Sequence, residues 1–287
     1  MSFEARSLLR SFGASLLFAI LTCGIASAQT SHYQPRNEQI PGPDCLDPQR
    51  NCSLDDYKTW LDDVRHWRME TRIRIGYSGN EYERLDLKWT QSSFIQPQMM
   101  IQDRYFYDPV KGKYTVDKYL NDLDKRYGGI DSVLIWHTYP NIGIDSRNQY
   151  DLLRSMPGGI EGVKQMIADF HRRGVKVLFP VMLWDQGTND SGTTDWEAIA
   201  KLMAEIGADG INGDTLGGVP RSFRSASDSI GHPLALEPEL MPPFEALAWN
   251  NMTWGYWQYP AAPMVSVLKW LEPRHMVNVC DRWNTNK

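Results

Sequence analysis

The chain has 287 residues, of which 42% are hydrophobic and 23% are charged, and its formal net charge is −5. This composition excludes an intrinsically disordered chain and allows a sizeable core. The acidic balance, without a basic run, excludes a nucleic-acid partner. One main domain is expected at this length.

The first 28 residues have the pattern of a secretory signal peptide. Arg6 and Arg10 precede an apolar run over residues 12–25, which ends in Ala26-Ser27-Ala28, the small-x-small pattern of a signal-peptidase site. The run is shorter than the roughly 20 residues that cross a bilayer. We therefore expect a secreted or periplasmic protein that does not associate with the membrane after cleavage.

Export changes the meaning of the cysteines. Cys23 leaves with the signal peptide, and Cys45 and Cys52 are close enough in sequence to form a local disulfide in an oxidising compartment. Cys280 is then unpaired. No spacing of cysteines or histidines resembles a zinc site, so neither a metal nor another cofactor is expected.

Residues 29–92 are expected to form an N-terminal extension. Its first part, up to about residue 51, is polar and proline-rich and is typical of an arm laid over a domain. Ser53, with Asp56 three residues later, resembles a capping box and predicts a helix. Alternating polar and apolar side chains over residues 71–75 suggest a short strand.

From residue 93 to 287, predicted strands and helices alternate. Strands are expected at Phe94–Ile101, Ser132–Trp136, Val175–Leu183, Gly210–Gly213, Leu234–Leu236 and Met276–Cys280. Helices are expected at Val116–Tyr127, Gly159–Arg173, Trp196–Ile206 and Pro263–Leu271. This alternation predicts an α/β fold with a parallel sheet, either open and doubly wound or closed as a (β/α)8 TIM-type barrel. No glycine fingerprint or phosphate loop follows the first strand, whereas polar and aromatic residues end strand after strand, which favours the barrel.

The predicted barrel is short. Barrels of this type take about 250 residues, and only six strands are found between Phe94 and Lys287. Either Met252 to Trp257 is an additional strand or the barrel is truncated. We expect truncation, because residues 283–287 resemble the middle of a loop.

Candidate site residues follow the predicted strands. They are Gln98 and Asp103, Trp136 and His137, Trp184 and Asp185, Asn212 and Asp214, Glu237 and Glu239, and then Asp281, Arg282 and Trp283. In a barrel, the carboxyl ends of the strands meet at the face that carries the chemistry. Carboxylates and amides there suit sugar hydroxyls, and indole rings suit the apolar faces of a sugar, so a carbohydrate partner is expected. Glycoside hydrolysis requires two carboxyl groups across the scissile bond.

Each candidate also has a structural interpretation. Trp136 and Trp184 suit core packing, and a lone histidine such as His137 is more often a hydrogen-bonded core residue than a ligand contact. Asp185 suits a turn, and Glu237, before Pro238, suits a solvated loop. The set of residues at one face is therefore more informative than any single member.

Two runs carry a family resemblance. Gly174-Val175-Lys176-Val177-Leu178-Phe179-Pro180 and Gly207-Ala208-Asp209-Gly210-Ile211-Asn212-Gly213-Asp214 resemble strands three and four of the α-galactosidase clan of TIM-barrel glycoside hydrolases. In that clan an aspartate that ends strand four is the nucleophile, and an aspartate after strand six is the acid/base. The resemblance implies that Asp214 is the nucleophile and, with Met276 to Cys280 as strand six, that Asp281 is the acid/base. Asn212 stands where the clan usually has a lysine, and Asp185 matches a substrate-contacting acid more loosely.

The sequence therefore favours a secreted retaining α-glycosidase, in which Asp214 attacks the anomeric carbon and Asp281 protonates the leaving oxygen. Two alternatives stay open. One is a barrel that binds carbohydrate, or serves as a scaffold, without catalysis. The other is an inactive fragment of a longer multidomain protein, because a barrel that lacks strands leaves sheet edges exposed. The sequence predicts no oligomeric state.

Overall fold

The structure is a computed structural model that describes residues 39–40, 52–101, 103–138, 144–185, 192–255 and 265–279. All of these residues belong to one compact unit, Ser31–Lys287. The predicted signal peptide and the candidates Asp281, Arg282 and Trp283 lie outside the described residues. Cys52 is disulfide-bonded, and its expected partner Cys45 also lies outside the described residues.

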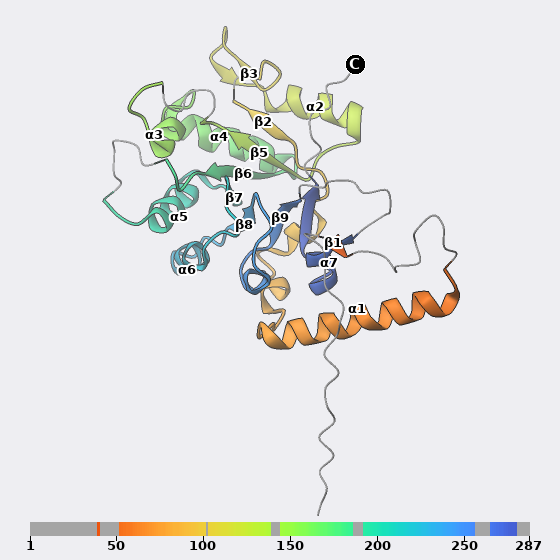
Figure 1. Cartoon of the computed structure of the whole chain (residues 1–287). Helices are drawn as coiled ribbons and strands as arrows, with labels where there is room; N and C mark the ends of the chain where they lie inside the picture. The colour runs from red at the N-terminus through yellow and green to blue at the C-terminus, as the bar shows by residue number, and fades with distance from the viewer. Residues whose placement is uncertain are drawn as a thin grey trace, which may run out of the picture. The chain divides into compact units, whose positions relative to one another are not determined.

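Five parallel strands form the main sheet in the order β2-β5-β6-β7-β8 (Figure 1). They are β2 (Gln98–Met100), β5 (Ser132–Trp136), β6 (Lys176–Val181), β7 (Gly210–Gly213) and β8 (Ala235–Pro238). β5 and β7 have the bounds that the sequence predicted, and the other three differ by a few residues. Each strand pairs with the next one along the chain, which confirms the predicted parallel α/β sheet.

Two further strands continue the arrangement. β9 (Met252–Gly255) lies beside β8, where the Asn251 N–H donates to the Leu236 carbonyl at 3.2 Å. β11 (Met276–Val279) pairs in parallel with β9. Residues 252–255 therefore form the additional strand that the sequence left as an alternative, and Met276–Val279 comes seventh in this order, not sixth. The sequence hid β9 because only a 3₁₀ turn, Phe244–Ala248, separates it from β8, so the helix that normally marks a new strand is missing.

Both faces of the curved arrangement are buried. The outward side chains, such as Val177 and Phe179, pack in one large cluster with the helices. These helices are α2 (Val116–Tyr127), α3 (Gln149–Arg154), α4 (Gly159–Arg172), α5 (Asp195–Ile206) and α6 (Arg221–Ser229). The inward side chains Leu134 and Leu178 pack instead with Trp254. Among the described residues no strand joins β11 to β2, so the arrangement is barrel-like without being closed.

The N-terminal helix α1 (Leu54–Arg74) begins with the predicted capping box between Ser53 and Asp56. It continues through residues 71–74, so the strand suggested there was wrong. Thr71 is buried, and Arg72 donates through Nε to the carbonyl of Leu271 at 2.7 Å, so these residues contact α7 (Val267–Leu271) as part of the helix. Helical hydrogen bonding and this contact outweigh a short alternating pattern.

The remaining elements are small. They are β1 (Gln39–Ile40) paired with β10 (Val265–Ser266), the hairpin β3 (Tyr107–Asp108) and β4 (Lys113–Tyr114), and the 3₁₀ turns η2 (Asn80–Glu83) and η3 (Lys88–Ser92). Within the described ranges, none of the helices has both the length and the apolar character needed to cross a bilayer.

His275 lies fully buried where the N-terminal segment meets β9. Its Nδ1 is 2.8 Å from the Tyr82 hydroxyl, and its Nε2 is 2.8 Å from the Thr253 hydroxyl. Burial lowers the pKa of His275 to about 3 from its usual 6.5. The histidine is therefore neutral in the folded protein, although in the unfolded chain it gains a proton below about pH 6.5.

We expect this histidine to make the fold acid-labile. Because the unfolded chain binds the extra proton, the stability associated with neutral His275 is present above about pH 6.5 and is lost as the pH falls toward 3. In urea unfolding at pH 7 and pH 4.5, a His275→Gln variant should lose less stability between the two pH values than wild type, by on the order of 1 kcal/mol or more. An equal loss in both proteins would contradict this role.

Candidate active site

Strand β7 carries Asn212 toward the interior and leads directly into Asp214. Ile211, the residue before Asn212, packs in the helix-covered cluster, so the strand period of two places Asn212 and then Asp214 on the opposite, inner side. Asn212 is fully buried, and Asp214 is 6% exposed. The glycines of this strand serve close packing, because a Cβ on Gly210 would lie 2.9 Å from the Ala235 Cβ.

The turn after Asp214 has an unusual backbone. Thr215 has φ 60° and is the only non-glycine residue with positive φ in the described part of the chain. A β-branched residue is strained in this left-handed region, and such strain persists only where its surroundings enforce it. The Thr215 N–H donates to the Glu239 carboxylate, and the Glu239 N–H donates to the Gly213 carbonyl at 3.1 Å. A Cβ on Gly213 would come within 2.7 Å of Leu216 Cδ1 and 3.1 Å of Val219 Cγ2, so a larger residue there would force these side chains to shift.

This geometry brings Glu239 next to the Asp214 turn. Glu239 follows β8, which pairs with β7 in parallel, so both acidic residues lie at the carboxyl ends of neighbouring strands. Glu239 is partly exposed, and Asp214 is nearly buried. Two carboxyl groups at neighbouring strand ends are candidates for acid/base or nucleophilic chemistry.

Glu237 lies deeper in the interior, two residues before Glu239. It is fully buried, with Asn278 Nδ2 donating to its Oε1 at 2.7 Å and Asn212 Nδ2 donating to its Oε2 at 3.3 Å. Gln96, just before β2, places its amide against the same carboxyl group. Burial raises the pKa of Glu237 to about 7, against the lowering effect of the amides. The sequence-based alternative of a solvated loop carboxylate is therefore wrong.

Trp136 and His137 take the structural roles that the sequence left open. Trp136 is 3% exposed on the inner face and stacks with Trp254, with 6.5 Å between ring centroids. His137 faces the helices, with its Nε2 3.1 Å from the Gln149 carbonyl and its ring edge-on to Phe179. Burial lowers the pKa of His137 to about 4, so it is a neutral core histidine.

Trp184 and Asp185, after β6, separate in role. Trp184 is 46% exposed, which leaves its indole ring accessible for stacking. Asp185 accepts a hydrogen bond from the Gln149 N–H at 2.6 Å, at the first turn of α3, where a carboxylate is favoured by the helix dipole. This contact matches the structural interpretation of Asp185.

Asp281, Arg282 and Trp283 follow β11 and lie outside the described residues. The basis for Asp281 as acid/base was that Met276 to Cys280 is strand six. Because β9 precedes β11 in the arrangement, this basis does not hold. The residues that the resemblance would place after strand six instead follow β9, and these too lie outside the described residues.

Sequence reasoning missed Thr215, Gln96 and Asn278. Asn278 had a detectable signal, because it alternates with Met276 on one face of a predicted strand. Nothing in the sequence marks Gln96, which precedes its strand, or a positive φ at a threonine. In the part of the chain that the structure covers, no group of three or more His, Cys, Asp or Glu side chains is placed to hold a metal ion.

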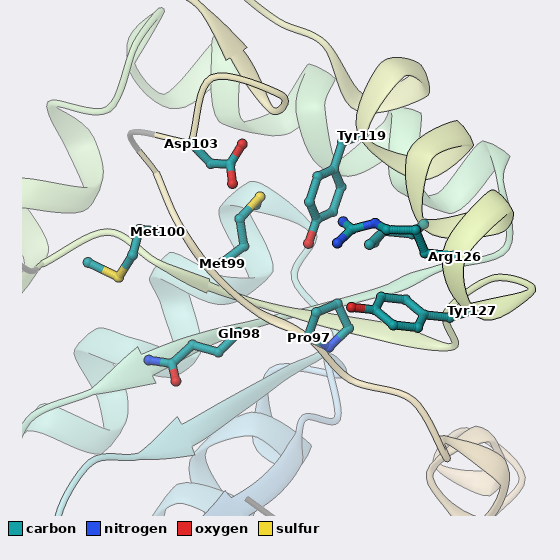
Figure 2. A pocket seen from close by; sticks show the side chains of 9 residues that line it. Pro97, Gln98, Met99, Met100, Asp103, Tyr119, Arg126 and Tyr127 are labelled. Atoms are coloured by element: carbon teal, nitrogen blue, oxygen red, sulfur yellow. The ribbon is translucent and has the colours of Figure 1, made fainter. Parts of the chain in front are cut away.

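A groove of about 520 Å³ lies elsewhere, between β2 and α2. Figure 2 shows Tyr119, Arg126 and Tyr127 of the helix beside Pro97 and Met99 of the strand segment, and all five line the groove. The groove is lined neither by the Asp214 turn nor by Glu237 and Glu239. The groove is therefore distinct from the candidate active site.

No protein-family model matches the chain, and no curated protein matches it. Among solved structures, it is similar to a maltogenic α-amylase, AmyB, from Thermotoga neapolitana, at 17% identity over 56% of this chain and 49% of the other, with a TM-score of 0.38. It is similar to α-galactosidase I from Mortierella vinacea, at 17% identity over 59% and 49%, with a TM-score of 0.37. A third is the α-amylase from Geobacillus thermoleovorans in complex with acarbose, at 15% identity over 57% and 51%, with a TM-score of 0.39.

The chain thus spans about half the length of each of these proteins. At these identities and TM-scores, the likeness establishes neither a family nor an activity for this chain.

Proposed function

We propose that this protein is a glycoside hydrolase with retaining chemistry at the Asp214 turn. The observation that carries the proposal is the strained Thr215 backbone between Asp214 and the Glu239 carboxylate. Strain of this kind is maintained at positions where a side chain must be held in a fixed orientation. Asp214, at the end of a buried strand, is the nucleophile that attacks the anomeric carbon.

The second carboxyl group protonates the leaving oxygen and then activates water. We assign this role to Glu239, which the hydrogen bond from Thr215 holds beside the nucleophile's turn. Asp281, the assignment from the family resemblance, is the alternative. A retaining enzyme places its two carboxyl groups about 5–5.5 Å apart, which neighbouring strand ends about 4.8 Å apart can provide.

The sugar would contact the exposed Trp184 ring and polar groups at the inner face. Two oxygen atoms there, Asn212 Oδ1 and Thr138 Oγ1, are buried and have no hydrogen-bond partner among the described residues. Buried polar atoms without partners are rare, and they favour a site that takes up water or hydroxyl groups. Arg282 and Trp283 would complete the subsite after β11.

We further propose that the protein acts outside the cytoplasm, secreted or in the periplasm. The N-terminal 28 residues have the signal-peptide pattern, and the disulfide at Cys52 suits an oxidising compartment. Expression with its leader in a bacterial host should release a chain that begins at Gln29, which N-terminal sequencing of the exported protein checks.

The test of the function is hydrolysis of a panel of α-linked and β-linked glycosides by the exported protein. Proton NMR of the first product should show the same anomeric configuration as the substrate. An inverted product would contradict the two-step mechanism, and hydrolysis that persists unchanged after replacement of Asp214 would contradict the site.

A non-catalytic carbohydrate-binding barrel is the second candidate. It is favoured by Asn212, whose amide donates to Glu237 at the position where the α-galactosidase clan usually has a lysine. Calorimetry that detects sugar binding by a protein that hydrolyses none of the panel would support this candidate over the first.

A further inference from the structure

Three side chains in the interior form a hydrogen-bonded group that the proposed chemistry does not use. They are Glu237 on β8, Gln96 before β2 and Trp254 on β9. Glu237 is fully buried, and the proposed hydrolysis assigns it no role. The three come from distant parts of the chain and meet below the carboxyl ends of the strands.

Trp254 fixes the orientation of the Gln96 amide. The indole Nε1 donates to Gln96 Oε1 at 3.3 Å. An indole N–H is only a donor, so the amide group must turn its oxygen, and not its NH₂, toward Trp254. With this orientation, the Gln96 NH₂ lies 3.3 Å from the Ser132 hydroxyl, which can accept from it.

The same amide oxygen faces the carboxyl group of Glu237. It lies 3.2 Å from Glu237 Oε1 and 3.1 Å from Glu237 Oε2. An amide oxygen and a carboxylate oxygen are both acceptors, and at this distance they repel each other unless a proton lies between them. Glu237 Oε1 already accepts the short bond from Asn278, so Oε2, which has only the 3.3 Å contact from Asn212, is the oxygen that carries the proton.

The reversed amide describes the ionised state. If Gln96 turned over, its NH₂ would donate to Glu237, and its oxygen would accept from Ser132. The NH₂ group would then also face the Trp254 N–H, so two donors would oppose each other and the indole would lose its acceptor. Only the protonated carboxyl group satisfies Trp254, Gln96 and Glu237 together.

We propose that Glu237 is a neutral carboxylic acid in the folded protein, that its O–H donates to Gln96, and that loss of this proton reverses the Gln96 amide. The proton thereby links β8 to β9 and to the segment before β2. The inference does not depend on the proposed hydrolase activity.

In the described part of the chain, no charged side chain is hydrogen-bonded to Glu237. Among the described residues, the groups that bond Glu237 are the neutral amides of Asn212, Asn278 and Gln96. The titratable groups of the adjoining strands, Asp214 and Glu239, lie two residues further along, at the strand ends. Burial raises the pKa of Glu237 from 4.5 to about 7.

The expected pH dependence has a definite sign. The folded protein keeps a proton that the unfolded chain releases, so the contribution of Glu237 to the free energy of unfolding falls as the pH rises from 4.5 to about 7. The pH dependence that His275 gives to the free energy of unfolding has the opposite sign. The contribution of Glu237 is therefore measured as the difference in pH dependence between wild type and Glu237→Gln.

The first test is ¹³C NMR of the full protein with ¹³C-labelled glutamate side chains, in which the Glu237 resonance is assigned by its absence from Glu237→Gln. This resonance should titrate at least ~1 pH unit above those of the exposed glutamates, a tenfold or greater difference in proton affinity. Infrared difference spectra should show the C=O band of a protonated carboxylic acid at about pH 6, and Glu237→Gln should lack it.

The Trp254→Phe variant distinguishes this hydrogen-bond arrangement from an effect of burial alone. Without the indole N–H, the Gln96 amide is free to reverse and donate to Glu237. The proton affinity of Glu237 should then fall at least tenfold, which lowers the midpoint of its titration. Trp184→Phe, which changes an exposed indole, should leave it unchanged. The proposal is overturned if the Glu237 resonance titrates with those of the exposed glutamates, or if Trp254→Phe leaves its midpoint where it was.

Discussion

Replacing Asp214 by Asn should reduce kcat by roughly 10⁴-fold, because an amide cannot form the covalent glycosyl intermediate. The substitution keeps the size of the side chain on a short, well-packed strand, so the free energy of unfolding should change by less than about 1 kcal/mol. Initial rates on the best substrate of the panel, together with urea unfolding of the same samples, measure the two quantities.

Asp209→Asn is the matched control at the other end of the same strand. The Asp209 carboxylate lies 2.6 Å from His171 Nε2 and accepts from Lys176 Nζ at 2.7 Å and from the Val177 N–H at 2.9 Å. This variant should lose stability and retain kcat, which is the reverse of Asp214→Asn. Full activity in Asp214→Asn would remove the nucleophile assignment.

The acid/base residue is identified by how strongly its loss slows the hydrolysis of glycosides with different leaving groups. A good leaving group needs little protonation, so loss of the acid should slow hydrolysis of such a glycoside much less than hydrolysis of one with a poor leaving group. We expect this pattern for Glu239→Gln. If Asp281→Asn shows the pattern and Glu239→Gln does not, the assignment moves to Asp281.

Arg224→Met should lower the free energy of unfolding by about 3–5 kcal/mol, the largest structural loss expected in the chain. Arg224 on α6 is 2.8 Å from the Glu81 carboxylate, and both side chains are 7% exposed. Arg224 Nη2 also donates to Asn251 Oδ1 at 2.7 Å, and Asn251 Nδ2 donates to Glu81 Oε1 at 2.9 Å. Burial raises the pKa of Glu81 and lowers that of Arg224, so each charge depends on the other.

The expected loss of stability comes from leaving the Glu81 carboxylate buried without Arg224, and not from the net stabilisation that the ion pair provides. A double variant, Glu81→Leu with Arg224→Met, should therefore recover a large part of the stability. Arg65→Met is the surface control, because the Arg65–Asp62 pair is more than 60% exposed on both sides, and it should cost less than about 1 kcal/mol. Urea unfolding at one pH compares all of them, and an Arg224→Met loss no larger than that of the control would refute the buried-pair account.

Local pattern determined much of the fold. The apolar run over residues 133–136 placed β5, because a strand buried on both faces needs only a continuous apolar stretch, and the short segment between a helix end and a glycine-rich loop placed β7. The capping box at Ser53 placed the start of α1 for a similarly local reason. Asp214 was identified from its position at a strand end, which a parallel sheet converts into a shared edge.

Tertiary structure decided the rest. β9 follows a 3₁₀ turn, so its membership of the sheet depends on packing against β8, and this changes the place of β11 and the basis for Asp281. The strain at Thr215 depends on a glutamate 24 residues later. The proton on Glu237 is fixed by Gln96 and Trp254, 158 residues apart, whose donor and acceptor atoms meet only once the strands have assembled.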